Sequence, residues 1–288
     1  MRFRAKVVDI GCVHHLTRVV NTISKLLKKC TLRFTSEKVY FILPDQVSNG
    51  GVSMWCEIKQ ENFFDEYQME GVNKDCNEIY LEVVAENLSR ALKSAQAAKA
   101  LKIKLTKKQS PCLSLEVELP SLASDSRTVT HDIPVTVIPR RLWGDYAEPN
   151  MPNYHVTIFM PPLKMVKTIA EKMKNISSYL ILAANQQGEM LMRVDTDLVT
   201  VKTSFQDLDI PDVSMEDEEV QSVSHRLAWP PDEFASARID IKKFLQFLAG
   251  QIINPERVIC NIVDGTIVQF FLLHDELSLQ YFIPAIAR

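Results

Sequence analysis

The sequence lacks the glycine-rich loops with which enzymes hold nucleotide phosphates. It has 8 glycines among 288 residues, and none is followed by lysine, so a Walker-type GK[ST] loop is absent. GxGxxG and GxSxG patterns are absent as well. The pair Gly50-Gly51, which follows Asn49 between two strand-like runs, is typical of a turn. We therefore expect no cofactor and no self-contained ATPase.

Spacings typical of metal ligands and of catalytic acids are also missing. The 6 cysteines are scattered, without a CxxC pair, and are expected to be small buried hydrophobes of a reducing compartment. His14 and His15 are neighbours on a predicted helix, where adjacent side chains point about 100° apart, so they cannot share a metal. The carboxylates of "MEDEEV", residues 215–220, lie in a run without apolar periodicity, which is typical of a solvated loop. The sequence favours no metal site, no catalytic residues and no enzyme.

Long apolar runs are missing too. No run approaches the ~18 residues of a membrane-spanning helix, and the first residues alternate bases with apolar side chains, as a strand does. With 46% hydrophobic and 24% charged residues, the composition is that of a globular chain. We expect a soluble, intracellular protein.

What the sequence does contain is an approximate duplication of strands and helices. Helices are predicted over 12–29 and 86–98 in the first half and over 163–174 and 242–250 in the second, each framed by strands. The pattern returns after about 155 residues. We predict an α+β fold of two domains, residues 1–138 and 155–288, in which helices cover one face of antiparallel sheets. The proline-containing stretch 139–154 is the predicted linker, and residues 207–233 are predicted to form a mobile acidic loop.

The predicted helices carry bases opposite their apolar stripes. In the first helix Val13, Leu16 and Val20 share one side, whereas Arg18 lies nearly opposite. Glu171 is the only acid that we place on the outer faces of these helices. Exposed helix faces normally mix both signs of charge, and the whole chain has a net charge of -3. A basic surface on such a chain indicates binding to a phosphate backbone.

The outer helix faces also lack aromatic residues, apart from the oblique Phe247. Stacking on single-stranded bases is therefore disfavoured, and a duplex held through its backbone is the better interpretation. A further basic run, "ALKIKLTKK" over residues 100–108, places Lys102 and Lys104 on one side of a strand and Lys107 and Lys108 in the turn beyond it. The sequence leaves the relation of this run to DNA open.

Several longer stretches carry a resemblance to a known family. The stretches are "GGVSMWCE" (50–57), "QENFFDEYQMEGV" (60–72), "ENLSRALKSAQ" (86–96), "THDIPV" (130–135), "KMKNIS" (172–177), "LQFLAGQ" (245–251) and "LSLQYFIPA" (277–285). Together with the duplication and the basic helices, they resemble the Hus-one family of the nine-one-one checkpoint clamp, a sliding DNA clamp. The resemblance covers nearly the whole chain. It implies tandem clamp domains with antiparallel sheets outside and two basic helices per domain lining a DNA hole.

The resemblance also implies a function. The chain would be a non-catalytic subunit of a heterotrimeric ring, with Rad-nine and Rad-one type subunits as partners. An ATP-driven checkpoint clamp loader would place the ring on damaged or gapped DNA, where it would support checkpoint kinase activation and repair enzymes. The implied location is the nucleus.

Three sets of site residues follow from the resemblance. The candidates for contact with the DNA backbone are Arg18, Lys25, Lys28, Lys29, Arg90, Lys93, Lys164, Lys167, Lys172, Lys242 and Lys243. The candidates for subunit contacts, on edge strands over 128–138 and 197–205, are Thr130, Asp132, Val135, Val137, Leu198, Thr200, Lys202 and Ser204. A groove for client peptides under the linker would contain Leu142, Trp143, Tyr146, Tyr281, Ile283 and Pro284.

Alternatives stay open from the sequence. One alternative is that the chain forms a self-sufficient homotrimeric clamp. The other, which the missing motifs disfavour, is that it is an enzyme with an unrecognised site. Trp143 would equally well staple the linker to the core without forming a groove. Whether the chain is the principal member of its family or a paralogue is also left open.

Overall fold

The computed structural model describes residues 1–287 apart from 27, 44–50, 62, 74–75, 121–126, 149–152, 212–226, 250–256 and 275–276. The first half contains β1 (Arg2–Val7), α1 (Ile10–Leu26), β2 (Lys29–Phe34), β3 (Lys38–Leu43), β4 (Ser53–Lys59), β5 (Glu66–Glu70), β6 (Ile79–Val84), α2 (Ala85–Lys93), β7 (Ala100–Lys107), β8 (Pro111–Leu119) and β9 (Arg127–Val137). A 3-10 helix (Arg140–Tyr146) follows. The second half contains β10 (Val156–Phe159), α3 (Leu163–Met173), β11 (Tyr179–Ala184), β12 (Met190–Asp195), β13 (Thr200–Phe205), β14 (Ala235–Asp240), α5 (Ile241–Ala249), β15 (Arg257–Val263), β16 (Ile267–His274) and β17 (Leu277–Pro284).

The strands form two antiparallel sheets. The larger has 13 strands in the order β10-β15-β16-β17-β4-β3-β2-β6-β9-β8-β7-β1-β5, and the smaller has the order β13-β12-β11-β14. The larger sheet joins the two halves of the chain, because β17 at the end of the second half pairs with β4 from the first. The predicted α+β class with antiparallel sheets is confirmed.

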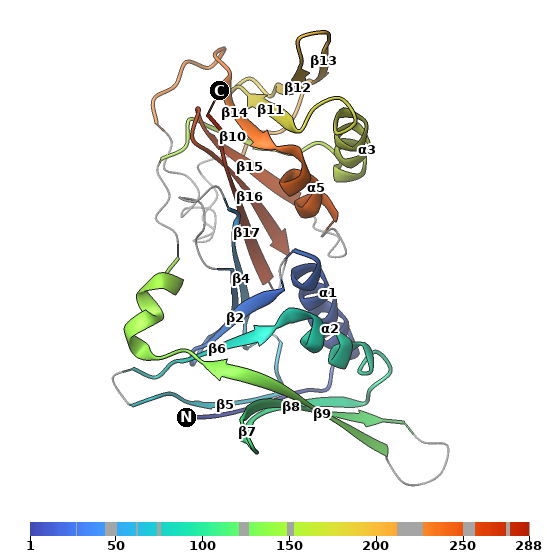
Figure 1. Ribbon diagram of the computed structural model, residues 1–288, viewed down its shortest axis with the longest axis vertical. Coiled ribbons are helices and arrows are strands. Elements are labelled where there is room, and N and C mark those ends of the chain that lie inside the picture. The colour runs from blue at the N-terminus through green and yellow to red at the C-terminus, as the bar shows by residue number, and fades with distance from the viewer. Residues whose placement is uncertain are drawn as a thin grey trace.

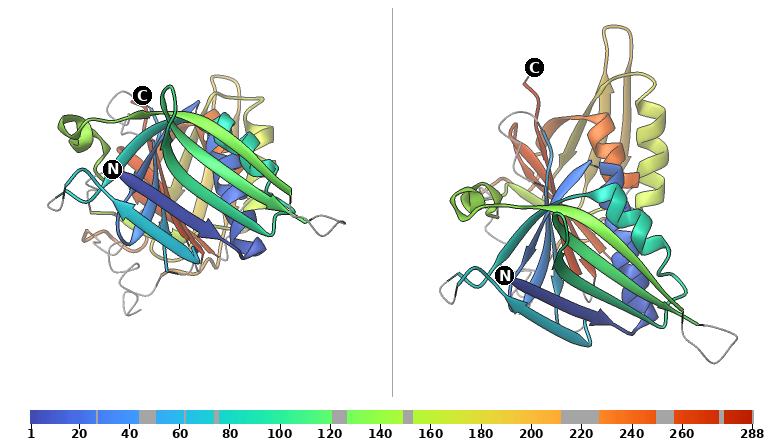
Figure 2. Two further views of the ribbon diagram at one scale, coloured as in Figure 1. Left: turned by 90° about the horizontal axis from the view of Figure 1, so that it is seen from below. Right: turned by 60° about the horizontal axis from the view of Figure 1, so that its bottom comes forward.

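The helices form a second layer on one side of the strands. In Figure 1, α1, α2, α3 and α5 lie along the right-hand side of the molecule, and the right-hand view of Figure 2 shows the same separation. α1 packs against α2, α3 packs against α5, and α1 also contacts α5 across the two halves. One face of each helix is therefore turned away from the sheets.

The alternation of buried and exposed side chains explains how the helix layer packs against the strands. In β1, Phe3 and Val7 are buried and Arg4 between them is exposed. The apolar stripe of α1, which includes Leu16 and Val20, belongs to the same core. Full burial of a side chain of this kind stabilises the fold by ~1.5–3 kcal/mol. The apolar stripes thus fix which helix faces stay in solvent.

The first two helices are shorter than the sequence pattern predicts. α1 ends at Leu26, Lys28 lies in a bend, and Lys29 is the first residue of β2. The pairing of β2 with β6 sets Lys29 opposite Val84, so strand pairing takes this residue out of the helix. α2 ends at Lys93 and is followed by a turn, whereas the pattern predicts a helix to residue 98.

The linker and the acidic loop contain more fixed structure than the sequence suggests. Residues Arg140–Tyr146 form a 3-10 helix. Within the loop, the Leu208 N–H donates to the Gly188 carbonyl, and the Leu227 N–H donates to the Tyr154 carbonyl. Residues 207–211 and 227–233 are thus anchored to the second half, and the acidic run 215–220 lies outside the described residues. The boundaries 1–138, 139–154 and 155–288 stay a prediction.

Candidate nucleic-acid interface and strand edges

Most of the predicted DNA contacts lie on the exposed faces of the helices. The turned-away faces of α1, α2, α3 and α5 each carry at least one exposed base. Lys167 on α3 and Lys243 on α5 are half-buried. The exposed bases on helices are Arg18, Lys25, Arg90, Lys93, Lys164, Lys172 and Lys242.

Some of these bases already have acidic partners. Arg90 forms an ion pair with Glu86, four residues earlier on α2. Lys167 Nζ lies 4.0 Å from Glu171 Oε1, and Lys29 Nζ lies 2.7 Å from an oxygen of the β6 carboxylate Glu82. Pairs this exposed contribute only ~0–1 kcal/mol, but each reduces the positive charge available to DNA. The exposed Glu86 corrects the prediction that Glu171 is the only acid on the outer helix faces.

The remaining bases are not neutralised within the described part of the chain. They occur on every helix of the layer, so positive charge extends along its whole length. Lys28, in the bend after α1, belongs with them. The described residues provide no ion pair for Arg18, Lys25, Lys28, Lys93, Lys164, Lys172 or Lys242.

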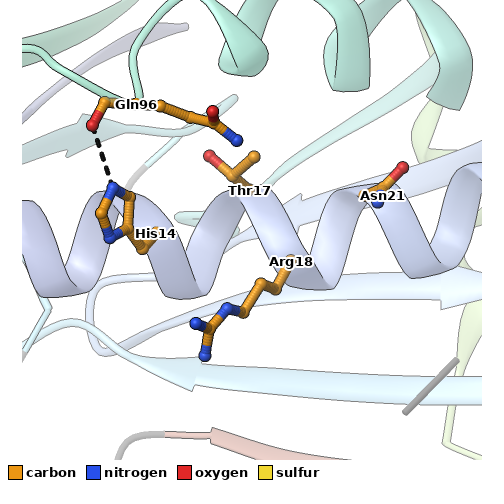
Figure 3. Close-up of a pocket in the computed structure, with 5 residues that line it drawn as sticks. All are labelled: His14, Thr17, Arg18, Asn21 and Gln96. Atoms are coloured by element: carbon orange, nitrogen blue, oxygen red, sulfur yellow. Dashed lines mark hydrogen bonds between the residues drawn. The ribbon is translucent and has the colours of Figure 1, made fainter. Parts of the chain in front are cut away.

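A hollow of about 330 Å³ lies between α1 and the turn after α2 (Figure 3). Its lining residues on α1 are spaced by three and four positions, so their backbone atoms lie on one side of that helix. Opposite them, the Gln96 carbonyl oxygen lies 2.9 Å from His14 Nε2, and since a carbonyl only accepts, Nε2 carries the proton. The lining residues are His14, Thr17, Arg18, Asn21 and Gln96. Of these residues, only Arg18 is predicted from the sequence for this surface, although Asn21 is three residues further along the same helix.

The predicted interface strand of the first half is open along part of its length. β9 pairs with β8 over Arg127–Pro134 but with β6 only over Val135–Val137. In the described residues, its second edge is unpaired at Thr130 and Asp132. The prediction that Val135 and Val137 lie on an open edge is wrong, because both pair with residues of β6.

Asp132 on this open stretch is already held in place. Its carboxylate accepts hydrogen bonds from Lys108 Nζ at 2.5 Å and from the Ser114 hydroxyl at 2.5 Å. The hydrogen bond from Lys108, followed by the one from Ser114, lowers the pKa of Asp132 below its ordinary value. Asp132 therefore organises its own sheet and offers little free charge to a neighbour.

The predicted interface strand of the second half is open over its full length. Among the described residues, β13 pairs with β12 alone. The hairpin turn between them is closed by a hydrogen bond from the Thr196 N–H to the Val199 carbonyl, and Leu198 in this turn is 97% exposed. Because hydrogen-bonded and non-bonded pairs alternate along an antiparallel ladder, every second residue of β13 directs its N–H and C=O to the open side. These residues are Thr200, Lys202 and Ser204.

The linker is fastened to the first-half sheet by Trp143. Its ring stacks on Tyr80 of β6 with centroids 4.5 Å apart, and its Nε1–H donates to the Ile138 carbonyl at 3.0 Å. Burial raises the pKa of the Tyr80 hydroxyl, so it stays neutral. On β2, Arg33 lies over the rings of Tyr80 and Tyr40, at 5.6 Å and 4.8 Å. Trp143 thus staples the linker to the first-half sheet and covers one face of the Tyr80 ring.

The predicted groove residues are not brought together. Tyr281 and Ile283 are fully buried in the main core, where the Tyr281 ring stacks on Phe247 of α5. The prediction is wrong for these two, because strand alternation puts them on the face that the helices cover. Phe282 faces the linker side in their place, in a separate cluster. Of the other predicted residues, Tyr146 packs on that cluster, Pro284 is buried and Leu142 is exposed.

The basic strand β7 faces away from the helix layer. Leu101 and Ile103 are buried in the core, so Lys102 and Lys104 lie on the outer face of the sheet. Lys104 Nζ donates to both oxygens of Glu116 on β8, at 2.9 Å and 3.0 Å. The run that the sequence left open therefore belongs to the outer sheet surface.

Other chemistry is scarce in the described part of the chain. Five cysteines are buried and Cys76 is half-buried, all as free thiols, and burial followed by the charge of Glu82 raises the pKa of Cys30 to about 12. The described residues contain no group of three or more His, Cys, Asp or Glu side chains that could hold a metal ion. No described helix is long and apolar enough to span a membrane.

Comparisons with known proteins agree with this geometry. The family described as Hus1-like protein matches residues 1–287. The chain belongs to the Hus1-like family. Human Checkpoint protein HUS1 is 55% identical over 288 residues, 100% of each chain. Checkpoint protein Hus1-like of Drosophila melanogaster is 35% identical over 79% of this chain and 84% of its own.

The fold of this Hus1-like chain is that of a sliding clamp. A crystal structure of proliferating cellular nuclear antigen from Entamoeba histolytica superimposes with a TM-score of 0.72 over 99% of both chains. The two are 12% identical in sequence, so this likeness shows the fold alone. Family and fold together make the chain a non-catalytic checkpoint clamp subunit and not an enzyme.

Proposed function

We propose that this Hus1-like chain is one subunit of a heterotrimeric ring around double-stranded DNA, with Rad-nine and Rad-one type clamp chains as neighbours. The observation that carries the proposal is the junction between its own halves, where β17 pairs with β4. In the repeat, β9 is the counterpart of β17 and β13 is the counterpart of β4. Both have open edges, which lie at opposite ends of the molecule (Figure 1). Head-to-tail contacts between such edges close into rings when the rotation fits.

The internal junction suggests a register for the external ones. Trp55 of β4 lies opposite Gln280 of β17. The strand pairings of the two halves can be matched residue by residue. In this match Lys202 of β13 is equivalent to Trp55 of β4, and Thr130 of β9 is equivalent to Gln280 of β17. A strand from one neighbour would lie beside Lys202, and a strand from the other beside Thr130. Main-chain hydrogen bonds would then hold the subunits together.

The burial of the helices supports the same assembly. α1 packs against α2 and α5, whereas its counterpart α3 packs against α5 in the described residues. Met165 on α3 is 50% exposed while Cys12, at the equivalent place on α1, is 6% exposed. Ile176 after α3 is 38% exposed while its equivalent Ile23 is fully buried. Because burying apolar surface contributes ~25 cal/mol per Å², the α3 flank favours a neighbour's helix at this place.

The helix layer is proposed to face DNA. The bases without acidic partners would neutralise phosphates and release counterions, which makes binding independent of sequence and sensitive to salt. Arg90, Lys29 and Lys167 would contribute less because Glu86, Glu82 and Glu171 lie beside them. Lys25, Lys93 and Lys242 are the strongest candidates of the set.

The wider role is proposed from family membership. The ring would act in the nucleus, an ATP-driven checkpoint clamp loader would place it on damaged DNA, and it would support checkpoint kinase activation and repair enzymes. Client peptides of these enzymes would contact the linker at Leu142, Trp143 and Tyr146.

The mass of the protein in solution tests this proposal. We expect the chain to be monomeric alone and to form a 1:1:1 complex when co-expressed with the two partner clamp chains. A stable trimer of this chain alone would contradict the heterotrimer and favour the homotrimeric clamp. Failure to join either partner would contradict the subunit role.

A further inference from the structure

The hollow between α1 and the turn after α2 is lined by side chains that can donate hydrogen bonds, with the Gln96 and Asn21 amides on one side of α1 and Arg18 directed to the other (Figure 3). Arg18 presents a planar fork of donors and has no ion pair in the described residues. The side-chain amide of Gln96 has no hydrogen-bond partner in the same part of the chain. Asn21 accepts a long contact of 3.5 Å from the Ser89 hydroxyl through Oδ1, which leaves its Nδ2 donors available.

Two of the polar groups around the hollow are already engaged within the chain. His14 Nε2–H donates to the Gln96 carbonyl, so this oxygen is satisfied. The Thr17 hydroxyl donates to the Val13 carbonyl at 2.7 Å. No carboxylate is among the lining residues. Free donors beside a guanidinium, without a carboxylate, select an anion over a cation.

We propose that this hollow seats one phosphate group of the DNA backbone. The amides of Asn21 and Gln96 contact the phosphate from one side of α1, Arg18 reaches it from the other, and His14 is a positioning residue that holds the turn carrying Gln96 against α1. The inference rests on the proposed function, because only a chain placed around DNA brings phosphates to the helix layer. Exposed lysines such as Lys25 act through charge alone, whereas the seat acts through directed hydrogen bonds that must break each time the ring moves by one phosphate.

The mobility of the ring on DNA separates these two kinds of contact. The complete heterotrimer is loaded on stretched duplex, and its one-dimensional diffusion coefficient is measured over a KCl series. Arg18→Lys keeps the charge but loses the fork, and Gln96→Ala removes an uncharged side chain while keeping the backbone carbonyl that His14 binds. Lys25→Ala, on the same helix but outside the hollow, is the matched control for charge. All three residues are exposed, so the variants are expected to assemble and melt as the wild type does.

The seat predicts that Arg18→Lys and Gln96→Ala each diffuse at least about threefold faster, at every salt concentration, as expected for a lost hydrogen bond to a charged group. Lys25→Ala is expected to diffuse faster chiefly at low salt. Wild-type mobility of Arg18→Lys and Gln96→Ala together with a faster Lys25→Ala would overturn the seat and leave the proposed function standing. Wild-type mobility of all three would count against the DNA-facing assignment of the helix layer itself.

Discussion

Trp143 of the linker and Tyr80 of β6 stack with ring centroids 4.5 Å apart and an interplanar angle of 23°. This contact attaches the segment between the two halves to the first-half sheet, beside the Ile138 carbonyl that accepts the indole N–H. While Trp143 lies on Tyr80, no client side chain can use that face of the ring. The position of the linker and the proposed access for client peptides therefore depend on the same pair.

Replacing Trp143 by alanine should free the linker without unfolding the sheets. The substitution removes a stacked pair, worth ~0.5–1.5 kcal/mol beyond burial, together with the bond to Ile138. We expect faster tryptic cleavage at Arg140 and Arg141 and a small fall in the denaturation midpoint. Leu142→Ala, at an exposed neighbouring position, is the control and should change neither. Equal cleavage of the Trp143 variant and the wild type would show that the stack does not hold the linker.

The Arg33–Glu78 pair should make stability depend on pH in the acid range. Burial alone raises the pKa of Glu78, but the bidentate hydrogen bonds and the charge of Arg33 bring it below its ordinary value. A carboxyl with a lowered folded pKa stabilises the fold above its unfolded pKa and loses that contribution as pH falls through the folded pKa.

Wild-type stability should therefore fall more steeply between about pH 5 and pH 3 than that of Glu78→Gln, which starts lower at neutral pH. Urea midpoints across this range provide the measurement. Glu70→Gln, at an exposed carboxyl of β5, is the control and should keep the wild-type slope. Parallel curves for the wild type and Glu78→Gln would mean that the pair makes no pH-dependent contribution.

Proline at neighbouring positions of β13 should have opposite effects. Lys202 directs its N–H to the open side, so Lys202→Pro is expected to leave the melting temperature of the free chain nearly unchanged and to block the addition of a partner strand. Thr203 directs its N–H to β12, so Thr203→Pro should cost about 1 kcal/mol or more of folding stability. Co-expression followed by mass measurement should show Lys202→Pro joined to one partner instead of two. A complete heterotrimer with Lys202→Pro would remove β13 from the subunit interface.

Local periodicity was enough to predict the helix layer, but helix ends depended on strand pairing. The stripe that includes Val13 and Val20 is buried as predicted, because the 3.6-residue period fixes one face. Lys29 continues the same helical phase, yet it pairs across from Val84, a partner that lies far away in the sequence. Because this pairing involves a residue far away in the sequence, a prediction from helical periodicity alone makes α1 too long.

Strand alternation likewise predicts which residues share a face but not what covers it. Tyr281 and Ile283 do lie on one face of β17, with Phe282 on the other. Which face meets the linker depends on the side of the sheet on which α5 packs, and this is a tertiary property. Glu86 is an exposed acid that the helical period does not place directly opposite the apolar stripe, yet it reaches Arg90 from the first turn of α2.

Topological attachment to DNA tests the central claim most directly. The heterotrimer is loaded on a closed circular duplex, unbound protein is removed at high salt, and retention is measured before and after a single cut linearises the DNA. An encircling clamp is predicted to stay on the closed circle and to slide off the linear form, and a variant combining Lys25→Ala, Lys93→Ala and Lys242→Ala should leave the cut DNA faster. Equal retention on circular and linear DNA, or loss from both in high salt, would contradict a ring that encircles the duplex.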